Sequence, residues 1–312
     1  MPELRTETMT VNMGPQHPST HGVLRLVLEI DGETIVSAEP TIGYLHTGIE
    51  KTAEQKKFQQ VIPLVERMDY LSAQSNAYAY CLSVERLLGL EMPDRVKWIR
   101  VLLAELQRIN SHLVWLGTHA MEVGAVSVML YCFRERELLL DINERIAGFR
   151  MFPSYIRIGG LREDLPRGFH DVVTQFLESF PAKLGEYEGL LTKNGIYRNR
   201  TRGVGRLSRQ ECIDLSLTGP IGRASGWNYD VRKMFPYGGY DTFEFDVPLG
   251  AEGDVYDRYL VRIAEMRESV KLCRQALSRI SPSGAFAADA PAVVPPPKDR
   301  VYTEMEALIQ HF

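Results

Sequence analysis

Residues 94–116 constrain the fold most strongly, because apolar side chains recur there at helical spacing over a long stretch. These apolar positions are Val96, Ile99, Leu103, Leu106, Ile109, Leu113 and Leu116. Spacings of three and four residues place them on one face of an α-helix, and Asp94 after Pro93 is a candidate cap for its start. Gly124 interrupts the pattern, and a second helix is predicted from about 126 to 148. The two segments predict a helical hairpin.

Two further helices and a small sheet complete the predicted architecture. Residues 170–193 and 254–280 are amphipathic at helical spacing, and four long helices favour a bundle core. Residues 8–13, 23–30 and 34–38 run apolar or alternate, with a turn at 31–32, which predicts an antiparallel β-meander. The predicted fold class is therefore α+β, mainly α: a small N-terminal antiparallel β region followed by a bundle of long helices.

The chain is predicted to divide into three parts. Residues 1–47 hold the β-meander and a loop with two histidines, and residues 48–280 hold the helical core. Within that core, an insert at about 198–248 is rich in Gly, Arg and Tyr and predicts loops and short strands. Residues 281–312 are predicted to form a Pro-rich extended arm and a truncated C-terminal helix, because prolines such as those at 295–297 prevent regular helix.

Composition excludes several classes of protein. The chain has 36 basic and 40 acidic residues, which argues against bulk nucleic acid or an anionic membrane surface as the partner. Its longest uncharged stretches, 109–121 and 123–133, are shorter than the roughly 18 residues of a membrane span. The N-terminus has no apolar leader, so a cytoplasmic location is expected. The four cysteines are far apart in the sequence, and we expect buried reduced thiols.

A loop near the N-terminus carries the most informative motif. Residues 14–22 read Gly-Pro-Gln-His-Pro-Ser-Thr-His-Gly, with His17 and His21 four residues apart. The two prolines forbid an ordinary helix, so the segment is a stiff loop that presents imidazoles. From spacing alone, a structural turn and a functional site both remain open. A metal site is disfavoured, because the sequence supplies no further matched set of ligands.

Ordered blocks along nearly the whole chain resemble one known family, the D subunit of the proton-pumping NADH:quinone oxidoreductase (respiratory complex I). That family is related to the large subunit of nickel–iron hydrogenases. The blocks are Gly14-Pro15-Gln16-His17-Pro18, His21-Gly22-Val23-Leu24-Arg25-Leu26, Gly43-Tyr44-Leu45-His46-Thr47-Gly48, Arg67-Met68-Asp69-Tyr70, Phe133-Arg134-Glu135-Arg136-Glu137, Tyr155-Ile156-Arg157-Ile158-Gly159-Gly160, Arg223-Ala224-Ser225-Gly226, Tyr229-Asp230-Val231-Arg232-Lys233 and Phe245-Asp246-Val247-Pro248.

The resemblance implies a site for quinone reduction. It places His21 and Tyr70 against the quinone headgroup, with His17 in the same cavity-lining loop. Reduction of a quinone takes two electrons and two protons, so donors that can give up protons are needed beside its oxygens. The family commonly has an aspartate that hydrogen-bonds the site histidine, and this chain has Glu122 at that position. The resemblance thus implies that Glu122 orients and charges His21.

The same resemblance implies a site without a metal. The hydrogenase relatives have cysteine ligands of nickel where this chain has Asp69 and Ser72, which are hard ligands that do not suit that centre. Quinone would occupy this pocket, near a 4Fe–4S cluster carried by a neighbouring subunit. Arg67 would raise the potential of that cluster through its charge. A histidine common in the family is Phe152 here, so pH-linked tuning of the cluster should be weak or absent.

The resemblance further implies partners and location. The chain would bind no cofactor alone and would not be active alone, because FMN and NADH bind elsewhere in the complex. The implied partners are the cluster-bearing B subunit, the C and I subunits, the membrane-embedded H subunit and quinone, with no nucleic acid. The implied location is peripheral, on the cytoplasmic side of the inner membrane.

Two alternatives stay open from the sequence. The same module occurs in ferredoxin-fed and reduced-deazaflavin-fed quinone oxidoreductases, and the sequence does not identify the electron donor. Family members continue beyond Phe312, so we expect a fragment, a truncated or split gene product, or a variant in which another chain fills the gap. A truncated, non-catalytic structural paralogue is the corresponding alternative function.

Overall fold

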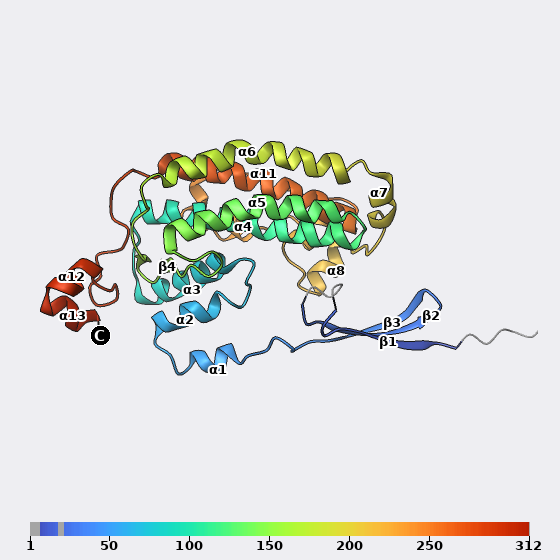
Figure 1. The fold of residues 1–312 in the computed structure, drawn as a ribbon, viewed down its shortest axis with the longest axis horizontal. Coiled ribbons are helices and arrows are strands. Elements are labelled where there is room, and N and C mark those ends of the chain that lie inside the picture. The colour runs from blue at the N-terminus through green and yellow to red at the C-terminus, as the bar shows by residue number, and fades with distance from the viewer. Residues whose placement is uncertain (1–6, 18–21, 312) are drawn as a thin grey trace, which may run out of the picture. The chain divides into compact units, whose positions relative to one another are not determined.

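The computed structural model describes residues 7–17 and 22–311. The chain separates into two compact units, Met1–Gln55 and Lys56–Phe312. The first unit holds three strands, β1 (Met9–Met13), β2 (Arg25–Asp31) and β3 (Thr34–Thr41), and the short helix α1 (Ile49–Ala53) (Figure 1). The strands form one antiparallel sheet in the order β1-β2-β3. The predicted β-meander is confirmed.

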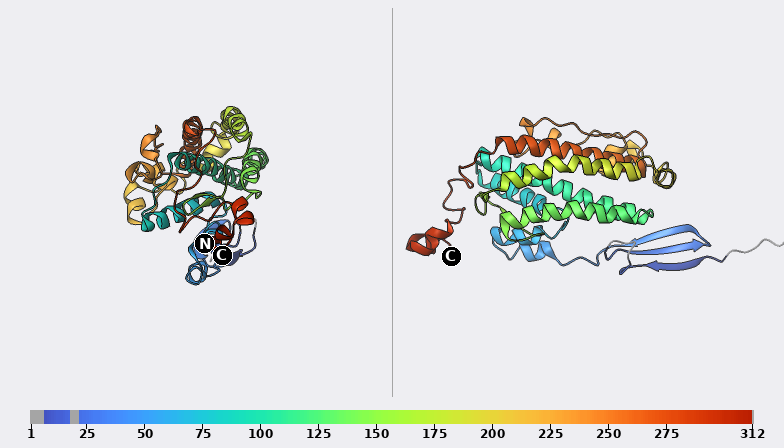
Figure 2. Two further views of the ribbon diagram at one scale, coloured as in Figure 1. Left: turned by 90° about the vertical axis from the view of Figure 1, so that its left-hand side faces the viewer. Right: turned by 45° about the horizontal axis from the view of Figure 1, so that its top comes forward.

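Four long helices form the core of the second unit. They are α4 (Asp94–Glu122), α5 (Val126–Ala147), α6 (Phe169–Leu191) and α11 (Val255–Arg279). Figures 1 and 2 show them side by side with their axes roughly aligned, and α4 packs against both α5 and α11. The predicted hairpin and bundle are therefore confirmed. The fold is mainly α with small antiparallel sheets, as expected, while the likeness to the hydrogenase large subunit remains a prediction.

Helix α4 is the central element of the bundle, because many of its own apolar side chains are buried. Ile99, Ile109 and Leu113 are completely buried. Burial of one such side chain is worth about 1.5–3 kcal/mol, so the helix is held mainly by packing. The sequence misplaced its start by one residue. Pro93 is the N-cap and accepts hydrogen bonds from the backbone of Val96 and Lys97, while the Asp94 carboxylate binds the Lys97 ammonium at 2.9 Å.

The remaining helices of the second unit are shorter. Helices α2 (Phe58–Val65) and α3 (Ala73–Leu88) precede the bundle, and the hairpin of β4 (Ile156–Arg157) and β5 (Gly160–Leu161) follows α5. The C-terminal part holds α12 (Lys298–Thr303) and α13 (Met305–His311). Before them, residues 281–297 contain no helix, as their prolines predicted. The three-part division at 47 and 280 remains a prediction.

The insert at 198–248 corrects one expectation. In place of strands it contains α8 (Arg209–Asp214), α9 (Pro220–Ala224), α10 (Val231–Met234) and the 3₁₀ turn η2 (Tyr240–Thr242), preceded by α7 (Gly195–Thr201). The apolar run 243–247 pairs with no strand among the described residues. Side chains of α11 take its backbone donors: Glu244 N–H donates to Gln275 Oε1 at 3.0 Å, and Asp246 N–H donates to Glu268 Oε2 at 2.8 Å.

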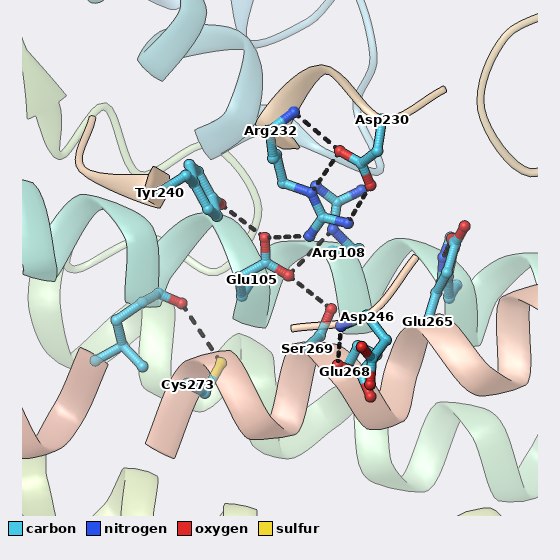
Figure 3. A network of polar contacts seen from close by, with 12 residues as sticks. Glu105, Arg108, Asp230, Arg232, Tyr240, Asp246, Glu265, Glu268, Ser269 and Cys273 are labelled. Atoms are coloured by element: carbon cyan, nitrogen blue, oxygen red, sulfur yellow. Dashed lines mark hydrogen bonds and ion pairs between the residues drawn. The ribbon is translucent and has the colours of Figure 1, made fainter. Parts of the chain in front are cut away.

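A buried ionic network joins α4 to α11 and to this insert (Figure 3). Glu105 is completely buried and accepts from Arg232 at 2.9 Å, Tyr240 at 2.7 Å, Ser269 at 2.7 Å and Arg108 at 3.2 Å. Arg232 also binds Asp230 at 2.7 Å. Both oxygens of the Glu105 carboxylate are thus satisfied, and this offsets the cost of removing its charge from water.

The structure agrees with the composition on two points, the burial of the cysteines and the hydropathy of the helices. All four cysteines, Cys81, Cys132, Cys212 and Cys273, are buried free thiols, as expected. Burial raises the pKa of the Cys81 and Cys132 thiols to about 12. Among residues 7–17 and 22–311, no helix is both long enough and apolar enough to cross a membrane.

Candidate functional site

The histidine loop is the connection between β1 and β2. His17 is exposed and forms an isolated antiparallel bridge with Gly22, which closes the loop at its base. His21 and residues 18–20 lie outside the described residues. Gly14 starts the loop at φ 88°, a left-handed conformation that favours glycine. A Cβ atom at this position would lie 2.1 Å from the Leu24 carbonyl oxygen, so only glycine fits.

Replacement of Gly14 by alanine is therefore expected to disrupt the histidine loop. The added methyl must displace the backbone of Leu24, the residue before β2, and the left-handed φ adds strain of about 1 kcal/mol or more. We expect faster proteolytic cleavage within residues 14–24, measured by limited proteolysis and mass spectrometry. Gly32→Ala is the matched control, because Gly32 is also left-handed at φ 60° but has nothing within 4 Å. Equal cleavage of the two variants would contradict the steric argument.

The turn between α2 and α3 carries three candidate residues. Backbone hydrogen bonds fix it: Asp69 O accepts from Ser72 N–H at 3.0 Å, and Asp69 Oδ1 accepts from Leu71 N–H at 3.1 Å. The buried amide of Gln107 on α4 donates to Leu71 O at 2.6 Å and ties the turn to the bundle. On this rigid base the Tyr70 side chain is 43% exposed and makes no hydrogen bond within the described chain. Its hydroxyl is available to a ligand.

Arg67 and Phe152 lie together, although 85 residues separate them in the sequence. The Arg67 guanidinium lies 4.4 Å from the centre of the Phe152 ring and donates to Pro63 O at 2.6 Å. Both side chains line a pocket of about 360 Å³, which we name the arginine pocket. Its full lining is Pro63, Arg67, Phe149, Arg150, Met151, Phe152, Pro153, Ser154, Arg157 and Arg162. Four guanidinium groups line the pocket, of which Arg150 and Arg162 are paired with carboxylates of this chain. Arg67 and Arg157 have no ion-pair partner among the described residues and make the pocket suitable for an anionic group.

Glu66 fixes the wall of the arginine pocket. It is completely buried, with Oε1 accepting from Ser154 N–H at 2.7 Å and Oε2 from Ser154 Oγ at 2.8 Å. Burial raises the pKa of Glu66, although Ser154, Arg67 and Arg157 oppose the shift. Ser154 has φ 42°, which is strained for a residue with a side chain and which these two hydrogen bonds hold in place. Burial and Arg162 lower the pKa of Arg157.

Glu122 is the last residue of α4, where a Schellman motif ends the helix. The Ala125 N–H donates to Ala120 O at 2.7 Å and the Gly124 N–H donates to Met121 O at 2.9 Å, with Gly124 at φ 94°. The Arg200 guanidinium donates to Val123 O at 2.9 Å and places a cation at this helix end, where the dipole favours one. These contacts hold the backbone of Glu122 at a defined, exposed position.

The described candidates thus fall into separate groups. Tyr70, Asp69 and Ser72 share one turn, Arg67 starts that turn and contacts Phe152, and Glu122 ends α4. His17 belongs to the first unit. The described residues contain no group of three or more His, Cys, Asp or Glu side chains arranged to hold a metal ion.

Sequence reasoning missed the residues that support the site. Hydrogen bonds between segments far apart in the chain hold the site in place, and they are made by Glu66, Gln107 and Ser154. No local sequence pattern identifies these three residues. Arg157 and Arg162 were the residues with the best available signal. Arg157 falls within a block that resembles the family. Arg150, Arg157 and Arg162 also recur within one short stretch of the sequence, which indicates a cluster of cations.

Comparison with known proteins identifies the family. Residues 122–312 match the family described as the 49 Kd subunit of respiratory-chain NADH dehydrogenase. A D subunit of NADH-quinone oxidoreductase from Koribacter versatilis is 58% identical over 306 residues, which cover 98% of this chain and 76% of that protein.

Two further relatives extend the same result. A D subunit from Chloroflexus aurantiacus is 56% identical over 310 residues, covering 99% of this chain and 75% of that protein. The D subunit from Geotalea uraniireducens is 52% identical over 307 residues, covering 98% and 78%. Identity at this level over nearly the whole sequence, together with the fold, shows that the chain belongs to the D-subunit family of NADH-quinone oxidoreductase.

Proposed function

We propose that this chain forms one wall of the cavity in which a proton-pumping NADH:quinone oxidoreductase reduces quinone to quinol. The observation that carries the proposal is the turn from Arg67 to Ser72. Its Tyr70 hydroxyl has no hydrogen-bond partner among the described residues, and Arg67, at the start of the same turn, lines the arginine pocket. One short segment would thus place a guanidinium beside an anionic redox group and a proton donor beside the quinone.

Tyr70 would donate a hydrogen bond to a carbonyl oxygen of the quinone. As electron density rises on that oxygen, the hydroxyl can transfer its proton, and two electrons and two protons together convert quinone to quinol. The fixed backbone of the turn positions the hydroxyl in advance, so little ordering is needed when quinone binds. For His21 the proposal rests on the family resemblance, which makes it the second donor, with Glu122 as its orienting carboxylate.

The arginine pocket would face the terminal 4Fe–4S cluster of a neighbouring subunit. Such a cluster is held by four thiolates and is anionic, which fits the guanidinium groups of Arg67 and Arg157. This chain cannot supply those thiolates, because its four cysteines are buried at separate places in the fold. Bound nearby, the cluster supplies electrons, and the role of these arginines is to stabilise the added negative charge. The B, C, I and H subunits remain the proposed partners, at the cytoplasmic side of the inner membrane.

Replacement of Phe152 by histidine tests the assignment of the arginine pocket. A phenyl ring cannot titrate, so we expect the midpoint potential of the neighbouring cluster to depend only weakly on pH in the wild-type complex. An imidazole in van der Waals contact with Arg67 should titrate below its usual value of about 6.5, since the nearby cation disfavours its charged form. The potential should then rise as pH falls through that range, by up to about 60 mV per pH unit.

Redox titration followed by electron paramagnetic resonance measures this slope in the intact complex. Phe235→His is the matched control, because Phe235 is an exposed phenylalanine of the same unit that does not line the arginine pocket. The same slope in the wild type and both variants would contradict the placement of Phe152 beside the cluster.

A further inference from the structure

A second pocket of the helical unit has buried polar side chains in its lining. Side chains from α3, from the turn after it, from the start of α4 and from residues 237–238 enclose about 360 Å³. We name this space the Tyr78 pocket. It shares no lining residue with the arginine pocket, and the proposed function does not use it. Its volume lies at the lower end of the range typical of ligand-binding sites.

Two buried donors in the lining of the Tyr78 pocket have no hydrogen-bond partner among the described residues. They are the Tyr78 hydroxyl and Arg100 Nε, in side chains of residues that are 2% and 1% exposed. The Arg100 guanidinium lies 5.5 Å from the centre of the Tyr78 ring, so the two groups are neighbours. A buried donor without a partner has lost its hydrogen bonds to water, and native proteins rarely leave such groups unpaired. The two donors therefore favour binding of an acceptor.

The charges around these donors are balanced. Glu85 accepts from Arg100 through both carboxylate oxygens, at 2.6 and 2.8 Å. At the rim, Lys97 is paired with a carboxylate of its own helix, and the exposed Arg86 and Glu91 carry opposite charges. A neutral acceptor such as an amide oxygen fits this balance, whereas a carboxylate would add an uncompensated buried charge.

Gly238 covers the Tyr78 hydroxyl. A Cβ atom at this glycine would lie 1.8 Å from the hydroxyl oxygen, so no side chain fits there. Gly238 and Gly239 are both left-handed, at φ 57° and 91°. Because two successive glycines leave the backbone free to change conformation, this cover can move aside when an acceptor approaches the hydroxyl.

Exposed apolar side chains lie beside the Tyr78 pocket, at the end of α3. Leu87 is 82% exposed and Leu88 is 51% exposed, and they stand in the chain between Arg86 and Leu90, which both line the pocket. Exposed leucines next to a pocket with buried polar groups are typical of a protein interface, in which a side chain of the partner fills a central pocket. A freely diffusing small molecule would not cover them. The leucines thus favour a protein partner.

We propose that the Tyr78 pocket is the docking site for a segment of a partner subunit that inserts an Asn or Gln side chain. The amide oxygen of that side chain would accept from the Tyr78 hydroxyl and from Arg100 Nε, and apolar residues of the segment would cover Leu87 and Leu88. The proposal rests on the proposed function, because that function makes this chain one subunit of an assembly.

Replacement of Tyr78 by phenylalanine separates docking from folding. In the purified chain, removal of an unpartnered hydroxyl should leave the urea unfolding midpoint unchanged or higher. In host membranes, loss of the hydrogen bond to the partner should lower recovery of the tagged chain in the complex by about fivefold. A lower midpoint with normal recovery would show that the hydroxyl is bonded to water or within the chain, and would overturn the proposal.

Tyr155→Phe is the matched control for Tyr78→Phe. Tyr155 is also buried, but its hydroxyl donates to Glu163 O at 2.8 Å. Its replacement should lower the unfolding midpoint of the purified chain and leave recovery in the complex close to that of the wild type. The two variants therefore differ in opposite directions in the two measurements.

A bulky side chain at the rim tests whether the pocket must stay open. Ser83 is exposed on α3, lines the Tyr78 pocket and donates to Ala79 O of its own helix at 2.9 Å. Ser83→Trp should obstruct the pocket and lower recovery in the complex about tenfold. Ser179→Trp is the control, because Ser179 is an exposed serine of α6 that donates to Phe176 O of its own helix and does not line the Tyr78 pocket.

A photo-crosslinking amino acid in place of Leu87 identifies the partner in the intact complex. The expected product joins residue 87 to a partner peptide that contains Asn or Gln between apolar residues. Replacement of that Asn or Gln by Leu should weaken assembly as Tyr78→Phe does, with little further loss when the two changes are combined.

Several results would overturn the docking proposal. They are the lack of a crosslink at residue 87, a crosslink to lipid alone or to a peptide without Asn or Gln, and equal recovery of Tyr78→Phe or Ser83→Trp and its control. The expected crosslink in a complex without NADH:quinone reductase activity would instead refute the proposed function and support the docking.

Discussion

Replacement of Tyr70 by phenylalanine is expected to lower quinone reduction by the assembled enzyme to about one-hundredth of the wild-type rate, the typical effect of a lost proton donor. The ring and its packing are kept, and only the exposed hydroxyl is removed. Electron transfer from NADH to an artificial acceptor such as ferricyanide should be unchanged, because that route does not use the quinone cavity. Both rates are measured on one purified preparation of the complex.

Tyr302→Phe is the matched control for Tyr70. Tyr302 is also an exposed tyrosine, at 84% exposure, and makes no hydrogen bond within the described residues, but it lies on α12. Its replacement should leave both rates at the wild-type level. An equal loss of quinone reduction and ferricyanide reduction in Tyr70→Phe would show a defect of assembly. Unchanged quinone reduction would remove Tyr70 from the site.

Replacement of Glu105 by glutamine is expected to destabilise the folded chain by about 3–5 kcal/mol, the usual cost of removing one partner from a buried charge network. Glutamine cannot balance the positive charges of the buried Arg232 and the half-buried Arg108. One carboxylate holds α4, α11 and the insert together in Figure 3, so we expect all three to loosen at once. Urea unfolding of the full chain, followed by circular dichroism, measures the loss.

The effect of Glu105 should depend on pH. Burial alone would raise the pKa of this carboxyl, but Arg108, Arg232 and the hydroxyls of Tyr240 and Ser269 together lower it to about 2. Because the pKa is lower in the folded state than in the unfolded state, the stabilisation is complete above pH 4.5 and is lost as pH falls towards 2. The gap in stability between wild type and variant should therefore narrow over that range.

Two further variants grade the Glu105 prediction. Ser269→Ala removes a single hydroxyl donor to Glu105 and should cost about 1–2 kcal/mol. Glu304→Gln breaks an exposed ion pair with Arg300 on the protein surface and should leave the unfolding midpoint close to that of the wild type, because solvent screens the pair. If all three variants had the same unfolding midpoint, the network would not contribute to stability as its geometry implies.

The sequence predicted the long elements well because their patterns are local. Apolar spacing over α4 and α5 reflects a buried helical face, and the 31–32 turn between alternating segments reflects a hairpin. The prediction of strands in the insert was wrong because the contacts that fix this segment are not local in the sequence. Its apolar run at 243–247 has the composition of a strand, but its backbone donors bind Gln275 and Glu268 on α11, contacts that no local pattern encodes.

The candidate site was predictable only in part. Family resemblance located Arg67, Tyr70 and Phe152, whereas the contact between Arg67 and Phe152 depends on how α2 packs beside the segment after α5. Glu66 was missed because a buried carboxylate with two donors from a strained serine has no signature in sequence. The role of His21 remains a prediction, since that residue lies outside the described part of the chain.

The most direct test of the central claim is purification of the tagged chain from gently solubilised membranes of its native host. The proposed function predicts that the chain co-purifies in a large complex whose NADH:quinone reductase activity is blocked by quinone-site inhibitors. Recovery of the chain alone, or in a complex without that activity, would contradict a working quinone-site subunit and favour a structural paralogue.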